Sequence, residues 1–146
     1  MPISVQVTTG LLTIDGEREV LPLVADALLR VHGLTGNKFM TPNVVGHLVV
    51  SPEAHSYVGG QQQSLAVIEV KVPSVTFPNA EVKQAFVSEA TDIIDRLKQG
   101  QHPRERTYVN GKPIQESALC SNQITCFLRR NASRRWIFIR NVVWDV

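Results

Sequence analysis

The sequence pattern of this chain of 146 residues predicts the order strand, helix, strand twice. Residues 3–8 alternate apolar and polar side chains, as a strand with one buried face does. Residues 15–32 then place apolar side chains at helical spacing, and residues 44–50 return to a strand. Because each strand is followed by a helix and a second strand, the pattern predicts parallel pairing within each unit and helices on one face of a sheet.

The first predicted helix contains two residues that interrupt or end helices. Pro22 lies inside the pattern, and proline lacks the N–H that the preceding turn needs. The helix is therefore expected either to begin near Pro22 or to bend there. Gly33 is the expected stop at its C-terminal end.

The second copy of the pattern follows a polar loop at residues 59–63. Residues 65–72 are predicted to form a strongly apolar strand, and Asn79 is the expected N-cap of the helix after it. Residues 107–109 are predicted to form a short strand that ends at Asn110-Gly111.

These elements predict a single α/β domain over residues 1–146. Its first repeat covers about residues 2–50 and its second about residues 64–110. A C-terminal hairpin is expected over about residues 124–146, with its turn at residues 131–133. The predicted fold is a two-layer sandwich of one sheet with two helices on one face. The other face would be bare, which favours a partner copy of the same chain.

The composition excludes several classes of partner. Lys and Arg number 15 against 13 Asp and Glu, and a net charge of +2 favours neither nucleic acid nor a membrane surface. Five arginines between residues 129 and 140 interleave with aromatic side chains, but they are expected to solvate the hairpin. No apolar run approaches the ~20 residues of a membrane span, and no secretory signal is recognised. Two cysteines give no disulfide framework, so a cytoplasmic protein without metal or other cofactor is expected.

Pro2 is the residue with the clearest capacity for catalysis. A penultimate proline is small enough for the initiator methionine to be removed, which would leave Pro2 with a secondary amine at the head of a strand. Burial or a nearby cation lowers the pKa of such an amine. It can then act as a general base, a general acid or a nucleophile. Many chains begin with Met-Pro without any such role, so the context of Pro2 decides.

Pro2 at the head of a strand, followed by two β-α-β units, resembles the tautomerase superfamily. Within it, the chain is most similar to the group of cis-3-chloroacrylic acid dehalogenase, whose subunits are similarly long fused repeats. The stretches that carry the resemblance are residues 33–36 (GLTG), 57–63 (YVGGQQQ) and 107–113 (TYVNGKP). The resemblance covers about residues 2–118. It implies a fold of the macrophage migration inhibitory factor type, a homotrimer, and Pro2 as the reactive amine.

The chain departs from that group where its members hold the carboxylate of their substrate. Two arginines are expected just before the second helix, and Val75 and Pro78 stand at the corresponding positions. The histidine expected near the end of the first helix is displaced by one position, to His32. Only Pro2 and Tyr108 match the group cleanly, so hydrolytic dehalogenation is not expected.

Five further side chains are candidates for the site. Tyr108 would donate a hydrogen bond to an enolate oxygen, and His32 would be a cationic imidazole at a helix end. Lys71 is expected near Pro2, where its ammonium would lower the pKa of the amine. Arg104 and Arg106 are candidate carboxylate anchors. Each also has an ordinary structural explanation. Tyr108 could be a half-buried strand residue, and His32 a surface residue that closes a helix. Lys71 could be a lysine that protects a strand edge, and the two arginines could be solvated loop charges.

The predicted activity is keto–enol tautomerisation of a small 2-oxo acid or related carbonyl compound, with Pro2 moving the proton. One alternative is hydration or decarboxylation of a small unsaturated or oxo acid, with cationic Pro2 as the acid. Another is a binding or accessory protein that keeps the fold without catalysis. In each case the expected assembly is a homotrimer.

Overall fold

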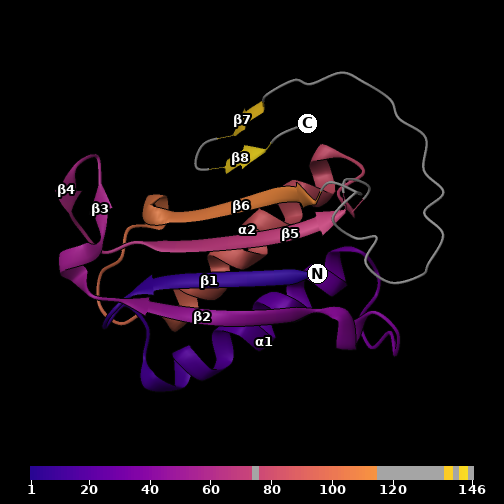
Figure 1. The fold of residues 1–146 in the computed structure, drawn as a ribbon, viewed down its shortest axis with the longest axis horizontal. Helices are drawn as coiled ribbons and strands as arrows, with labels where there is room; N and C mark the ends of the chain where they lie inside the picture. The colour runs from indigo at the N-terminus through magenta and orange to yellow at the C-terminus, as the bar shows by residue number, and fades with distance from the viewer. Residues whose placement is uncertain (74–75, 115–136, 140–141, 145–146) are drawn as a thin grey trace.

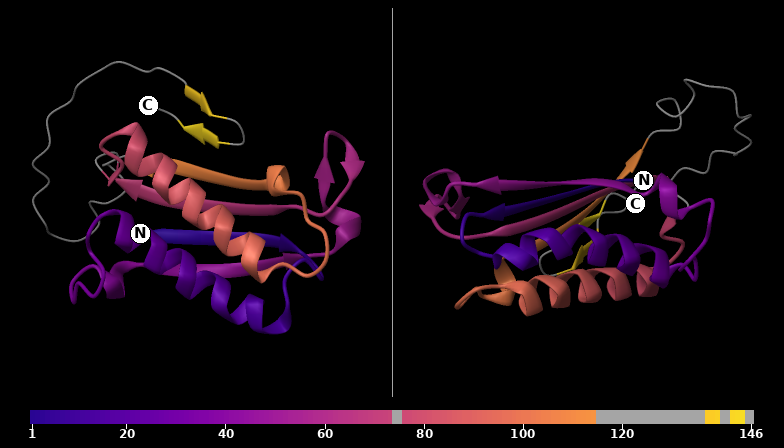
Figure 2. Two further views of the ribbon diagram at one scale, coloured as in Figure 1. Left: turned by 180° about the vertical axis from the view of Figure 1, so that it is seen from behind. Right: turned by 90° about the horizontal axis from the view of Figure 1, so that it is seen from below.

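The computed structural model describes residues 1–73, 76–114, 137–139 and 142–144, as a mixed sheet with two helices on one face (Figure 1). Figure 2 shows both helices on the same side of the strands. The predicted α/β fold class is therefore confirmed. The strands lie in the order β2-β1-β5-β6-β8-β7. The main elements are β1 (Pro2–Thr8), α1 (Ile14–Val31), β2 (Val45–Ser51), β5 (Ala66–Pro73), α2 (Ala80–Leu97), β6 (Thr107–Ile114), β7 (Ile137–Ile139) and β8 (Val142–Trp144).

The two predicted units are joined antiparallel. Within each unit the strands are parallel, β1 with β2 and β5 with β6, as the sequence predicts. Between the units β1 runs antiparallel to β5. The start of β1 therefore lies beside the end of β5, and we call this the Pro2 end of the sheet. The opposite end, where β5 and β6 begin, we call the Tyr108 end.

The core lies between the sheet and the two helices. Alternate residues of β1, Ile3, Val5 and Val7, are almost completely buried beneath the helices. The residues between them point to the other side of the sheet, which we call the open face. The large side chains that share the core with β1 are Val20, Val24, Leu28, Ile68, Val70, Phe86, Ile94 and Val109.

Helix α1 begins at Ile14, well before Pro22, where one of the two expectations placed its start. Thr13 caps it, its hydroxyl accepting a hydrogen bond from the N–H of Gly16 at 2.8 Å. The helix then continues through Pro22, which is exposed. The expectation that the helix begins near Pro22 is wrong, because the Thr13 cap and the buried stripe that begins before Pro22 stabilise the turns on both sides of it.

The C-terminal end of α1 is the expected glycine stop. Gly33 has φ +65° and donates its N–H to the carbonyl of Arg30 at 2.9 Å. Leu34 donates to the carbonyl of Leu29 at 2.8 Å. This pair of bonds is the Schellman arrangement, which satisfies the last carbonyls of a helix. The prediction for Gly33 is confirmed.

Two short segments differ from the prediction. Strand β6 does not end at Asn110-Gly111, because these residues pair with Glu69 and Val70 of β5 and the ladder continues to Ile114. The predicted loop at residues 59–63 contains a small hairpin of β3 (Tyr57–Val58) and β4 (Gln61–Gln62). Its turn is Gly59-Gly60, with positive φ at both residues, as a tight two-residue hairpin requires.

The predicted C-terminal hairpin is described only in its second part. The turn expected at residues 131–133 lies outside the described residues. Strands β7 and β8 pair antiparallel with each other, and β8 joins the sheet beside β6 through Gly111 and Trp144. Among the described residues, no helix is long and apolar enough to span a bilayer.

Candidate functional site

Pro2 and Lys71 lie side by side at the Pro2 end of the open face. Pro2 pairs with Val45 of β2 on one side. On its other side Ile3 pairs with Val70, and the same antiparallel register places Lys71 opposite Pro2. Both Pro2 and Lys71 are exposed, whereas Ile3 and Val70 are buried on the helix side. The structure therefore brings Lys71 to the neighbourhood that the sequence analysis expected for it.

Met1 continues the ladder between β1 and β2 by one residue. The N–H of Val45 donates to the carbonyl of Met1 at 3.1 Å. The amino nitrogen of Met1 donates to the carbonyl of Asn43. Burial lowers the pKa of this amino group from its ordinary value, because partial removal from water disfavours the charged form.

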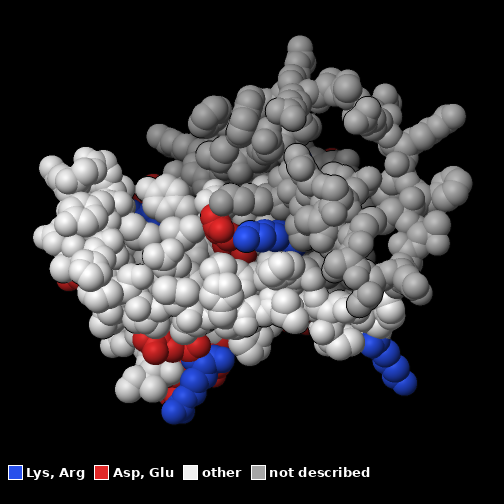
Figure 3. Space-filling view, in the orientation of Figure 1, with Lys and Arg blue, Asp and Glu red and all other residues white. Residues whose placement is uncertain are grey.

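A row of polar side chains crosses the open face next to Pro2. Ser4 and His47 are paired in register, and the Ser4 hydroxyl lies 3.1 Å from Nε2 of His47. Glu69 is opposite Ser4 on β5, and Asn110 is opposite Glu69 on β6. In the view of the open face, acidic and basic side chains lie next to each other near its centre (Figure 3). The sequence analysis did not single out this row, because its members come together only through the register of four strands.

His32 lies at the C-terminal end of α1 and is held by the main chain. Its Nδ1 lies 2.7 Å from the carbonyl of Leu28, and its Nε2 contacts the carbonyl of Thr76. The ring also packs against Phe77, with 5.4 Å between ring centroids. Both ring nitrogens are therefore used within the protein. This arrangement favours a structural link between α1 and the segment before α2 over the substrate-binding role considered from the sequence.

Tyr108 lies at the other end of the sheet from Pro2 of the same chain. It pairs with Val67, and Val67 pairs with Gln6 of β1. Tyr108 is displaced from Pro2 by four residues along the strands, at about 3.3 Å each, and by two strand spacings across the sheet, at about 4.8 Å each. Together these displacements place the two Cα atoms about 16 Å apart. One chain alone does not bring Pro2 and Tyr108 together around a small substrate.

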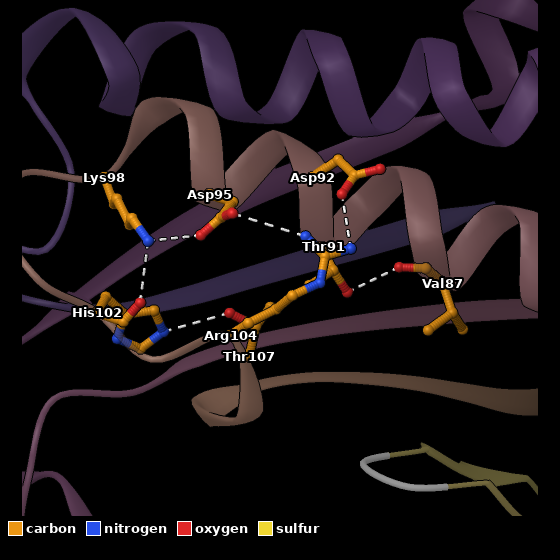
Figure 4. Close-up of polar contacts among 8 residues, drawn as sticks. All are labelled: Val87, Thr91, Asp92, Asp95, Lys98, His102, Arg104 and Thr107. Carbon is orange, nitrogen blue, oxygen red and sulfur yellow. Dashed lines mark hydrogen bonds and ion pairs between the residues drawn. The ribbon is translucent and has the colours of Figure 1, made fainter.

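The two arginines also lie at the Tyr108 end. Arg104 is paired with Asp92 at 2.6 Å and with Asp95 at 3.6 Å, both on α2 (Figure 4). Its guanidinium is thus already occupied by carboxylates of its own chain. Arg106 directly precedes β6, and its N–H donates to the carbonyl of Pro103. Neither arginine lies near Pro2 of the same chain.

A buried histidine lies beside this ion-pair cluster. His102 is 4% exposed, its Nε2 lies 3.2 Å from the hydroxyl of Thr107, and its Nδ1 has no partner among the described residues (Figure 4). Burial lowers the pKa of His102, and the nearby charges of Lys98 and Arg106 lower it further, against the opposing effect of Asp95. Lys98 donates to the carbonyl of His102 at 3.1 Å. A single loop histidine gave no signal in the sequence that would have identified it.

An open apolar groove of about 250 Å³ lies between α1 and the start of β2. Its walls include Leu21 and Ala25 from α1 and Val45 and Gly46 from β2. A Cβ atom at Gly46 would come within 2.8 Å of Cδ2 of Leu21 and 3.2 Å of the carbonyl oxygen of Ile3, so a larger residue here would displace the Leu21 side chain. The described residues contain no group of three His, Cys, Asp or Glu side chains that could hold a metal ion.

Comparison with known proteins identifies the fold. No family model and no curated protein matches the sequence. Among solved structures, a fused 4-OT wild-type symmetric trimer matches with TM-score 0.65 and 17% identity over 80% of this chain and 88% of that chain. The FG41 malonate semialdehyde decarboxylase inhibited by 3-bromopropiolate matches with TM-score 0.62 and 14% identity, over 86% of this chain and 92% of that chain.

A third match extends the same pattern. The macrophage migration inhibitory factor-like protein from Entamoeba histolytica has TM-score 0.57 and 14% identity, over 77% of this chain and 88% of that chain. These neighbours are members of the tautomerase superfamily. This chain has the tautomerase fold. The finer resemblance to the cis-3-chloroacrylic acid dehalogenase group stays a prediction.

Replacing His102 by glutamine is expected to reduce the loss of stability in acid. Because the folded protein lowers the pKa of His102 below its ordinary value of 6.5, the unfolded chain binds this proton first. The free energy of unfolding contributed by His102 is full above about pH 6.5 and falls as the pH drops from there towards the lowered pKa. Urea unfolding at several pH values measures the slope, which becomes shallower in H102Q.

The matched control is His55→Gln, which removes an exposed imidazole and leaves the slope as in the wild type. Equal slopes in the wild type and H102Q would show that burial of His102 does not couple its protonation to folding.

Proposed function

We propose that this chain is a tautomerase in which Pro2, freed by removal of Met1, moves a proton between oxygen and carbon of a small 2-oxo acid. The observation that carries the proposal is the position of Pro2, exposed at the head of β1 with Lys71 beside it. The tautomerase fold supports this reading, because Pro2 occupies the start of its first strand.

The chemistry requires only a base and a compensating charge. The neutral amine of Pro2 takes the hydroxyl proton of the enol, which breaks the O–H bond and leaves an enolate. The resulting cationic amine returns that proton to carbon 3, which forms the C–H bond of the ketone and restores the base. The Lys71 ammonium stabilises the carboxylate of the substrate and disfavours a second positive charge at Pro2. No cofactor takes part.

Tyr108 enters this scheme from another copy of the chain. Since about 16 Å separates it from Pro2 of its own chain, a hydrogen bond from Tyr108 to the substrate needs a neighbouring subunit. Solved structures with this fold include symmetric and asymmetric 4-OT trimers. In a closed trimer of this chain, the Tyr108 end of one copy would meet the Pro2 end of the next. Arg106 would lie beside Tyr108 at the site of the neighbouring copy, whereas Arg104 would remain paired with Asp92 of α2.

A second candidate reaction is decarboxylation of a small oxo acid. It is favoured by the likeness to malonate semialdehyde decarboxylase, which covers 86% of this chain. In that reaction Pro2 would act as the cation, withdrawing electrons from the bond that breaks. Release of carbon dioxide from malonate semialdehyde, without ketonisation of phenylenolpyruvate, would favour this second reaction.

The proposed assembly predicts a particle of three times the 16.2 kDa chain mass in light scattering. Val49 is an apolar side chain exposed on the open face. The variant Val49→Glu is expected to shift the particle to monomer, because it buries a charge between copies. Ile14→Glu changes an exposed apolar residue at the start of α1 and is expected to leave the trimer intact. A stable wild-type monomer at micromolar concentration would contradict the trimer.

Blocking the amine of Pro2 is expected to abolish ketonisation of phenylenolpyruvate. A chain with one additional residue before Pro2 keeps its fold but has no free amine at this position. Pro2→Ala keeps a primary amine on a more mobile terminus, so it should retain part of the ~10²–10⁴-fold contribution of a general base. Mass spectrometry of the purified chain establishes whether Met1 is removed. An unchanged rate in the blocked protein would show that the amine of Pro2 is not the base, and the proposed tautomerase mechanism would fail.

Removing the charge of Lys71 is expected to weaken binding of the carboxylate. A hydrogen bond to a charged group contributes about 1.5–3 kcal/mol, so Lys71→Met should raise KM for phenylenolpyruvate at least about tenfold. The control Lys38→Met removes an exposed lysine from the loop between α1 and β2 and should leave KM unchanged. Equal KM values in the two variants would exclude Lys71 as the carboxylate anchor.

A further inference from the structure

Met1 holds two main-chain groups that lie directly beside the nitrogen of Pro2. Its carbonyl accepts a hydrogen bond from the N–H of Val45 at 3.1 Å. Its amino nitrogen donates to the carbonyl of Asn43. Because the carbonyl carbon of Met1 is bonded to the nitrogen of Pro2, both contacts are made within one residue of the proposed base.

Removal of Met1 therefore exposes three groups at once. It frees the amine of Pro2, and it leaves the N–H of Val45 and the carbonyl of Asn43 without the partner they have here. Main-chain donors and acceptors need a partner, so water or a ligand must take the place of Met1.

Both main-chain groups are fixed in position by structure that does not include Met1. Val45 begins β2, which pairs with β1 from Pro2 to Thr8. Asn43 ends a short 3₁₀ helix (Thr41–Asn43), donates its N–H to the carbonyl of Met40 at 3.0 Å and its side-chain amide to the carbonyl of Phe39 at 2.7 Å. The N–H of Val45 is thus preorganised, as a donor that stabilises a developing negative charge needs to be.

We infer that the place of the Met1 main chain is the subsite for the enol oxygen of the substrate, with the N–H of Val45 as its hydrogen-bond donor. The inference rests on the proposed function of Pro2. The oxygen of an enol hydroxyl can accept from the N–H of Val45, as the carbonyl oxygen of Met1 does here, while its O–H donates to the amine of Pro2 that takes the proton. As the proton passes from this oxygen to Pro2 and on to carbon 3, the N–H of Val45 stabilises the enolate oxygen.

The same geometry sets the orientation of the substrate. The N–H of Val45 provides a donor on the β2 side of Pro2, so this side suits the enol oxygen, whereas the carbonyl of Asn43 is left to water. Lys71 lies on the β5 side and attracts the carboxylate. A 2-oxo acid in its enol form would lie across Pro2 with its enol oxygen towards β2 and its carboxylate towards β5.

The direct test replaces the Val45 N–H by an ester oxygen, using the 2-hydroxy acid counterpart of valine in the full-length chain without Met1. The side chain is unchanged, and only the donor is lost. Removing one oxyanion donor typically costs about 10²–10³-fold in rate, and a loss of this size is expected for ketonisation of phenylenolpyruvate. The control is the same ester at Val50, because N–H groups of successive strand residues alternate in direction and that of Val50 points away from β1.

The outcomes separate the inference from the proposed function. If the Val45 ester turns over phenylenolpyruvate as fast as the Val50 ester while a blocked Pro2 is inactive, the base is retained and the subsite is wrong. If the blocked protein is active, the proposed function fails, and this inference fails with it.

A second measurement does not depend on the folding of the ester variant. In nitrogen-15-labelled protein without Met1, titration with phenylpyruvate is expected to shift the amide signal of Val45. In protein that retains Met1, that amide is already bonded and its signal should not move. Equal responses of Val45 in the two forms, or no response in either, would overturn the inference.

Discussion

The register of β1 is the constraint on which the rest of the structure depends. β1 lies between β2 and β5, and its alternate residues Ile3, Val5 and Val7 are buried beneath both helices. Burial of each such side chain contributes about 1.5–3 kcal/mol. A shift by one residue would turn all three to the open face. The same register therefore fixes Pro2 on the open face and sets Val45 and Lys71 as its two neighbours.

The antiparallel contact between the two units divides the chemistry between the two ends of the sheet. Pro2 and Lys71 lie at one end, whereas Tyr108, Arg104 and Arg106 lie at the other. Each chain thus carries two separate groups of candidate site residues. If the proposed trimer joins unlike ends, each complete site takes its base from one copy and Tyr108 from another. Assembly and catalysis would then depend on the same contacts.

Local patterns in the sequence predicted most of the fold, because they depend on neighbours along the chain. The Asn79 cap, with its side chain 2.9 Å from the N–H of Val82, and the Gly33 stop are of this kind. The continuation of β6 through Asn110-Gly111 was missed, because it depends on pairing with β5 rather than on local turn propensity. For the site, the proximity of Lys71 to Pro2 follows from strand order, whereas the Ser4–His47 pair needs the register between strands.

The main-chain groups at Val45 and Asn43 are invisible to any reading of residue types. The chemistry of a side chain can be inferred from the residue type. Every residue except proline has a main-chain N–H, however, and only the fold determines which of these donors lacks a partner. The tautomerase resemblance drew attention to two arginines that are absent at Val75 and Pro78, and so to side chains that could replace them. Main-chain atoms need no replacement residue, since a strand that starts one residue later than its neighbour leaves a donor of that neighbour without a partner. In the proposed form without Met1, β1 starts one residue later relative to the edge strand β2, so the event that frees the Pro2 amine would also free the N–H of Val45 for an enolate oxygen.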